Sequence, residues 1–165
     1  MQDTIARHLA GVSADKDRKA LRAILNALAD RLSSQIFNTG GLAIKTGGSA
    51  LAKTVNTVIA LAGGVYVSVA AADMPALTGL NIGAGKFNVA VFYVNSAGTV
   101  SVKFGAEGST AALVKFPDTP QGQAIIGFLM ITYASAFTGG TTALDTATTV
   151  YVNTVGAFDP SVLLS

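Results

Sequence analysis

Hydrophobic residues near the N-terminus recur at the spacing of an α-helix. Four leucines stand four, three and four positions apart: Leu21, Leu25, Leu28 and Leu32. Most charged residues of this stretch fall off that line, and Ser13 or Asp15 can accept hydrogen bonds from the first free N–H groups. The pattern predicts a helix that runs past Ile36 and ends at Asn38-Thr-Gly-Gly. A shorter helix is predicted over residues 3–10, ending at Gly11.

The line of four leucines, which we call the leucine seam, has two interpretations. A narrow seam of this kind is typical of a coiled coil between subunits. It is equally typical of a helix that packs on the β-domain of its own chain. The stretch is only two to three heptads long, so the sequence leaves both interpretations open.

From Leu42 onward the hydrophobic period changes to two, which is the period of β-strands. The alternation predicts strands at Leu42–Lys45, Leu51–Leu61, Val65–Val69, Phe87–Val94, Thr99–Phe104, Ile125–Tyr133 and Thr148–Asn153, and a short strand or extended piece at Ala111–Phe116. Within Phe87–Val94, positions 87, 89, 91 and 93 face one way and the others the opposite way. Leu77–Gly85 is predicted to be a loop.

These elements predict a mainly β chain with an N-terminal α-helical arm. The β part is expected to form an antiparallel β-sandwich or barrel, jelly-roll-like, because short strands alternate with glycine-rich turns. The arm is assigned to residues 1–40, with an anchoring or oligomerising role, and the β-domain to residues 41–153. Residues 154–165 form an apolar C-terminal tail that is expected to dock on another surface.

Charge is distributed very unevenly along the chain. Charged residues make up 12% of the sequence, against about 25% in ordinary globular proteins. Ten of the twenty charged residues lie in positions 1–37, so the β-region is nearly uncharged. Such a surface is expected to be covered partly by copies of the chain or by a partner. The net charge of +2 provides no basic patch for nucleic acid.

The sequence predicts no membrane segment and no secretory signal. Two uncharged stretches, Thr54–Ala72 and Thr119–Leu144, are interrupted by glycines and polar residues, and we interpret them as buried strands. The first residues contain no apolar stretch of the kind that signal peptides need. The chain has no cysteine, which excludes disulfides and thiolate metal sites.

Residues suited to catalysis or metal binding are sparse. The single histidine, His8, has no companions at metal-ligand spacing. Turn chemistry explains the acidic residues that stand beside prolines and other loop residues, which are Asp73, Asp118 and Asp159. Gly79-Leu-Asn-Ile-Gly-Ala-Gly-Lys86 lacks the first glycine and the Ser or Thr of a phosphate loop, and a strand follows it. We therefore expect no catalytic residue, no metal and no cofactor.

Three segments in the C-terminal two-thirds carry a resemblance to a known class of proteins. They are the hairpin turn Asn95-Ser-Ala-Gly-Thr-Val, the link Pro117-Asp-Thr-Pro-Gln-Gly before an apolar strand, and the loop Phe137-Thr-Gly-Gly-Thr-Thr-Ala-Leu. In this order, over roughly residues 50–152, the chain resembles virion structural proteins of tailed bacteriophages, of the head-decoration or head-fibre type. The N-terminal helix is not covered by this resemblance.

The resemblance implies a non-enzymatic protein that binds the capsid surface and assembles as a symmetric oligomer. Its partners would be the major capsid protein and other copies of the chain, as a homotrimer, with no nucleic acid and no membrane. It would be synthesised in the host cytoplasm and located on the virion. The leucine seam is the candidate oligomer contact. The candidate capsid-contact charges are Arg7, Arg18, Lys19 and Arg22, together with Lys16.

Two other function classes remain. In a receptor- or glycan-binding module, such as a tail-fibre or spike tip, the loops Leu77–Lys86 and Glu107–Ala112 would bind a cell-surface glycan. In an enzyme, such as a capsule depolymerase, a set of polar side chains would have to converge, and the sequence gives no sign of one.

Overall fold

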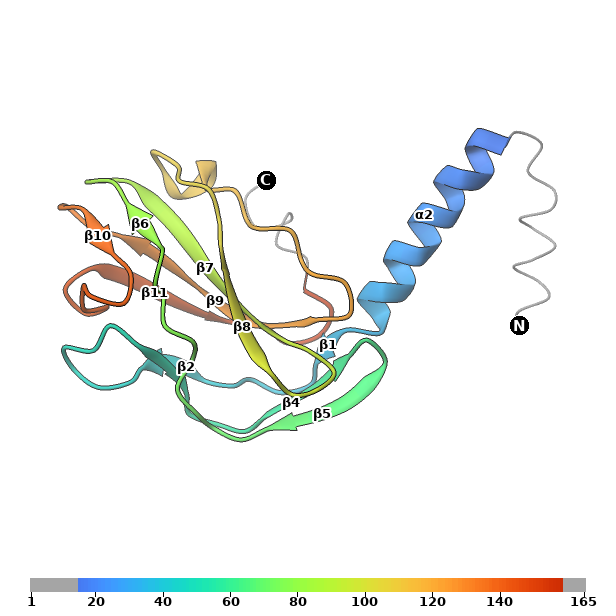
Figure 1. The fold of residues 1–165 in the computed structure, drawn as a ribbon, viewed down its shortest axis with the longest axis horizontal. Helices are drawn as coiled ribbons and strands as arrows, with labels where there is room; N and C mark the ends of the chain where they lie inside the picture. The colour runs from blue at the N-terminus through green and yellow to red at the C-terminus, as the bar shows by residue number, and fades with distance from the viewer. Residues whose placement is uncertain (1–14, 159–165) are drawn as a thin grey trace. The chain divides into compact units, whose positions relative to one another are not determined.

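The chain separates into two compact units, Met1–Leu32 and Ser33–Ser165. The structure is a computed structural model that describes residues 15–158, without the side chains of residues 15–17, 27 and 31. The predicted short helix at residues 3–10 therefore lies outside the described residues, as does most of the C-terminal tail. The first unit contributes one described helix, α2 (Asp15–Leu32), and every described strand belongs to the second (Figure 1).

Helix α2 ends earlier than the sequence predicts. Its last residue is Leu32, and the chain then turns into strand β1 (Gln35–Ile36), where Ile36 is only 1% exposed. Gln35 and Ile36 pair with Leu61 and Ala60 of the adjacent antiparallel strand, β4 (Val58–Ala62). Serines at positions 33 and 34 favour local side-chain hydrogen bonds over helix, and the burial of Ile36 favours the strand. The prediction that the helix continues past Ile36 is wrong.

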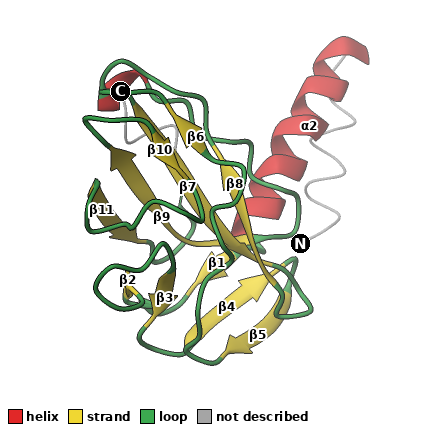
Figure 2. Cartoon of the chain, turned by 60° about the vertical axis from the view of Figure 1, so that its left-hand side comes forward, coloured by secondary structure: helices red, strands yellow, loops and turns green. Residues whose placement is uncertain are grey.

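The second unit consists of short antiparallel strands. After β1 they are β2 (Leu42–Ile44), β3 (Ala52–Thr54), β4 (Val58–Ala62), β5 (Val65–Val69), β6 (Asn81–Ile82), β7 (Phe87–Val94), β8 (Val100–Phe104), β9 (Ala124–Thr132), β10 (Phe137–Thr138) and β11 (Thr148–Asn153). The largest sheet has the order β11-β9-β7-β8, and a second has the order β1-β4-β5. Two-stranded pairs β2-β3 and β6-β10 complete the unit (Figure 2).

The main core lies between the four-stranded sheet and the smaller sheets. Its members from β7 are Ala90, Phe92 and Val94, and alternate residues of β4 and β9 face the same core. The opposite face of β7 belongs to a second apolar cluster, which contains Val89, Val91 and Tyr93. The predicted division of Phe87–Val94 into two faces is therefore confirmed.

The second cluster covers the outer face of the four-stranded sheet. Residues from the connection after β8 and from the chain after β11 pack over it. Phe116 meets Phe128 edge-on with ring centroids 5.0 Å apart, and Phe158 stacks on Phe128 at 5.9 Å. Strand β9 is buried on both sides as a result, as its nearly all-apolar sequence predicts.

Several predicted elements need correction. Leu51–Leu61 is two strands, β3 and β4, because the Val55–Thr57 segment turns back onto Gly40. The predicted loop Leu77–Gly85 contains the short strand β6, which pairs with β10. In the predicted short strand or extended piece Ala111–Phe116, residues 111–113 form a turn of 3-10 helix, and Lys115 forms an isolated antiparallel bridge with Ala106. The fold is mainly β and antiparallel, and its assignment to a barrel or a jelly roll stays a prediction.

The second unit has two distinct ends. At one end, Gly64 N–H donates to the Ser33 carbonyl (2.8 Å) and Gly63 N–H to the Ser34 hydroxyl (3.2 Å), so the chain enters the unit there. We call this the arm end. Strands β7 and β9 run from it to the other end, where loops 45–51, 73–86, 105–114 and 133–147 gather (Figure 1). We call this the loop end.

Candidate functional site

The leucine seam lies along α2 with much of its apolar surface exposed. Leu28 is 51% exposed and Ile24, beside the seam, is 64% exposed, while Leu21 and Leu25 are half-buried. A stripe of this kind has the spacing that a second helix could pack against. The leucine seam has two interpretations, a coiled coil with another copy and packing on the β-unit of its own chain, and both stay predictions.

The candidate capsid-contact charges are only partly described. Lys19 and Arg22 are exposed on α2, and Arg18 is half-buried. Arg7 lies outside the described residues, and the side chain of Lys16 is not described. The described cations share one helix with the leucine seam, so one element presents both an apolar and a basic surface.

The two loops considered for glycan binding meet at the loop end. The Glu107 carboxylate accepts a hydrogen bond from Gly83 N–H (2.7 Å) and forms an ion pair with Lys86 Nζ (3.1 Å). Phe87 and Gly108 exchange two backbone hydrogen bonds beside this contact. The Gly83 N–H, and secondly Lys86, lower the pKa of Glu107 below its usual value. The carboxylate is therefore ionised and joins two loops that are far apart in the sequence.

This contact also explains the glycine-rich segment before Lys86. In a phosphate loop, free backbone N–H groups bind an anion at the start of a helix. Here the Gly83 N–H already binds the Glu107 carboxylate, and Lys86 leads into strand β7. The chain's own carboxylate takes the anion's role, which supports the structural interpretation of this segment.

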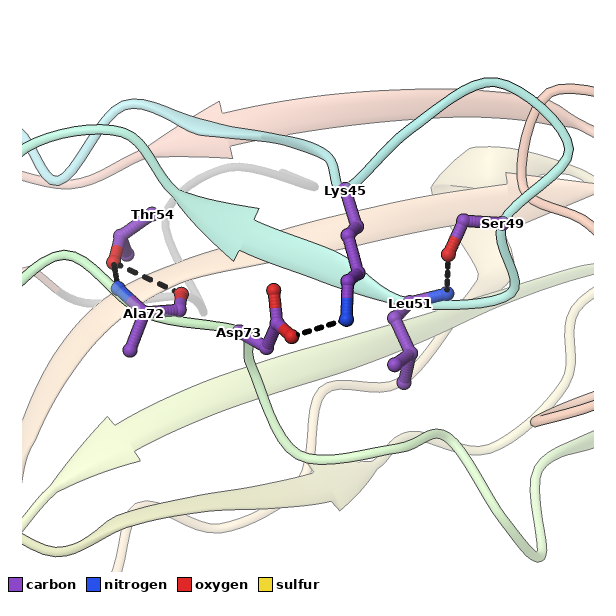
Figure 3. Close-up of polar contacts among 6 residues, drawn as sticks. All are labelled: Lys45, Ser49, Leu51, Thr54, Ala72 and Asp73. Carbon is purple, nitrogen blue, oxygen red and sulfur yellow. Dashed lines mark hydrogen bonds and ion pairs between the residues drawn. The ribbon is translucent and has the colours of Figure 1, made fainter.

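Other loop-end aspartates have comparable partners. Asp145 accepts a hydrogen bond from Gly48 N–H at 2.7 Å, and Asp73 forms an ion pair with Lys45 (Figure 3). Nearby, the Thr54 hydroxyl accepts a hydrogen bond from Ala72 N–H and donates one to the Ala72 carbonyl. The Ser49 hydroxyl accepts a bond from Leu51 N–H at 3.0 Å. The carboxylate of Asp73 thus joins two segments far apart in the sequence, and its predicted bond to a nearby backbone N–H stays a prediction. Asp159 lies outside the described residues.

Tyr93 carries a buried hydroxyl in the second apolar cluster. The side chain is 0% exposed and its hydroxyl makes no hydrogen bond of normal geometry. Burial, partly offset by the nearby Thr119 side chain and assisted by the charge of Asp118, raises the pKa of Tyr93 to about 12. The phenol is neutral at any physiological pH and closed off from solvent, so it is suited to packing more than to proton transfer.

An apolar surface that the sequence reasoning missed lies on the outer face of the β1-β4-β5 sheet. Its six outward positions are Gln35, Phe37, Ile59, Leu61, Tyr66 and Ser68. Tyr66 is 64% exposed and Phe37 is 52% exposed, and no outward position is charged. We call this surface the bare face. Alternation in Val65–Val69 predicts the strand, but it does not say that both faces would be apolar.

The described residues contain no group of three His, Cys, Asp or Glu side chains placed to hold a metal ion. Within the same part of the chain, no helix has the length and apolarity needed to cross a membrane. No protein-family model matches the sequence, and no curated protein or solved structure matches it significantly.

Proposed function

We propose that this chain is a non-enzymatic decoration or head-fibre protein of a tailed bacteriophage. The observation that carries the proposal is the contrast between the two units: a charged helix joined by a two-residue link to a nearly uncharged antiparallel β-unit. The helix suits attachment and assembly, and the β-unit suits a compact projecting part.

The arrangement of the β-unit supports this proposal. The chain enters at the arm end, so the loop end lies at the far side of the same unit. The loop-end carboxylates of Glu107, Asp145 and Asp73 are engaged with backbone N–H groups or lysines. A stable surface with internally satisfied loops is what a repeated structural protein needs.

In this proposal the arm binds the major capsid protein. Arg18, Lys19 and Arg22, with Arg7, would meet an acidic capsid surface, while the leucine seam would hold copies together as a homotrimer. The chain would then be found on the virion surface after its synthesis in the host cytoplasm.

A matched charge reversal tests the attachment. The triple change Arg18→Glu, Lys19→Glu and Arg22→Glu should lower occupancy on shells of the major capsid protein at least tenfold, because each contact becomes repulsive. The control is Lys53→Glu, Lys103→Glu and Lys115→Glu, which makes the same change in net charge within the β-unit. Equal occupancy for the two triple variants would reject attachment through the arm, provided that circular dichroism shows α2 intact.

One observation favours a second candidate, a receptor- or glycan-binding module. The contact of Glu107 with Gly83 and Lys86 joins two loops into one surface at the loop end. Whole-cell binding by the full chain that is lost with Glu107→Ala, and kept with Asp73→Ala, would support this candidate. Absence of binding to host cells and to a glycan array would reject it.

A further inference from the structure

The bare face differs from the other outer sheet face of the same unit. The outer face of β11-β9-β7-β8 is covered by the chain itself, through Val114, Phe116 and Phe158. Within residues 33–158, no segment packs in the same way over the bare face, where Phe37 and Tyr66 stay more than half exposed. Antiparallel sheets with one solvated face usually alternate apolar and polar residues. The bare face departs from that rule, because four of its six outward positions hold large apolar residues.

The bare face is continuous across the sheet. Gln35, Leu61 and Tyr66 form one row across the three strands. Phe37, Ile59 and Ser68 form the next row, since Phe37 N–H donates to the Ile59 carbonyl (2.8 Å) and Ile59 is opposite Ser68. Neighbours in such rows pack side by side. The apolar residues therefore form one patch instead of scattered single contacts.

The edge of the same sheet is also open. Strand β5 is the last strand of its sheet and pairs with β4 alone among the described strands (Figure 2). It carries no charged residue, whereas β8, an edge of the larger sheet, carries the exposed Lys103. Charges on edge strands oppose pairing with other chains. The β5 edge lacks this protection.

We propose that the bare face is the contact between β-units of neighbouring copies of this chain. The positions from Thr54 to Ala72, which include β4 and β5, hold no charge, so a charged partner would gain nothing from this surface. A second copy of the same neutral, apolar face is complementary to it. The proposal rests on the symmetric assembly in the proposed function and names the surface involved.

The link between the two units adds a geometric argument. Only Ser33 and Ser34 separate the end of α2 from β1, and a link of that length spans about 10 Å at most. If the leucine seams of several copies pack around one axis, β1 of each copy must start close to that axis. Gln35 belongs to the bare face, so assembly through α2 would bring this residue of each copy close to the same axis.

Cross-linking of single-cysteine variants tests the contact directly, because the natural chain has no cysteine. Tyr66→Cys in the full chain should give covalent dimers with a short bis-maleimide. Leu113→Cys, at a site 60% exposed on the 3-10 turn, is the matched control and should stay monomeric on a denaturing gel. No cross-linking at position 66, or equal cross-linking at both positions, would overturn the proposal.

A second measurement uses charge in place of cross-linking. Phe37→Glu with Tyr66→Glu should weaken self-association of the full chain at least tenfold in sedimentation equilibrium, because like charges would face each other. Leu113→Glu with Val150→Glu introduces the same charges at comparably exposed sites and should leave association unchanged. A natural chain that is monomeric at every concentration, or equal association of both variants, would overturn the proposal.

The two proposals fail in distinguishable ways. If Tyr66→Cys cross-links and the chain does not bind shells of the major capsid protein, the contact stands and the capsid role is wrong. If the chain binds shells and the bare-face variants associate like the controls, the capsid role stands and the contact is wrong.

Discussion

At the scale of single residues, backbone crowding and loop contacts decide what the β-unit tolerates. A Cβ on Gly139 would overlap the carbonyl oxygen of Leu77, and Gly139 N–H donates to the Leu80 carbonyl at 2.7 Å. The sequence shows a Gly-Gly pair at this point and predicts a loop. It does not show that the first glycine lies against a segment sixty residues away, because that contact depends on the pairing of β6 with β10.

Gly139→Ala should therefore lower the free energy of unfolding by about 2 kcal/mol or more, since the overlap is with backbone that cannot rotate away. Urea unfolding followed by circular dichroism measures this. Gly47→Ala is the control, because its Cβ would meet only the Asp145 carboxylate at 3.9 Å, and it should change stability by less than about 1 kcal/mol. Equal stability of the two variants would contradict the predicted packing of these loops.

The contact of Glu107 with Gly83 and Lys86 makes the loop end sensitive to acid. The folded pKa of Glu107 is lowered, so its contribution to stability is present above the unfolded pKa. That contribution is lost as the pH falls through the folded pKa. Carbon-detected NMR titration should place the pKa of Glu107 below its usual value, and the hydrogen-exchange protection factor of Gly83 N–H, which corrects for the intrinsic pH dependence of exchange, should fall at acid pH. In Glu107→Gln this acid-dependent loss of protection should disappear, and its persistence would contradict the assignment.

At the scale of elements, periodicity predicted the long strands well and the short ones poorly. Phe87–Val94 appears with the predicted bounds and faces, and β9 is shifted by one residue from the prediction. The two-residue strands β1, β6 and β10 are too short to show a period, and they exist because distant partners pair with them. Ile36 is a further example of a position that periodicity cannot assign. It continues the apolar spacing of the helix before it, and it suits a buried position in a strand equally well.

The start of the β-unit follows from β1. A chain that begins at Ser33 keeps Ile36 in the core. It also keeps Asn38, whose side-chain amide donates a hydrogen bond to the Thr57 carbonyl (2.7 Å) and accepts one from Ile59 N–H (2.6 Å). A chain that begins at Gly41 loses both. We expect the shorter chain to be less stable by about 3 kcal/mol or more, from lost burial and unpaired backbone groups. Calorimetry of the two chains measures this, and equal melting temperatures would show that β1 contributes nothing.

At the scale of the whole molecule, the sequence predicts two parts with different chemistry, and the described residues divide into two compact units. The candidate site was harder to predict. The charges of the arm can be read from the sequence, but the bare face arises only when β1, β4 and β5 align their outward positions. The contact of Glu107 with Gly83 likewise joins residues that sequence spacing does not relate. Both depend on strand pairing over long sequence separations.

We propose that the chain attaches to a virion shell in many identical copies. Electron cryomicroscopy of shells of the major capsid protein, incubated with the full chain at saturating concentration, tests this most directly. We expect saturable binding and density that projects from the shell at regular symmetric positions, with the β-unit outward. Shells that stay bare at saturating concentration of a folded chain would contradict it.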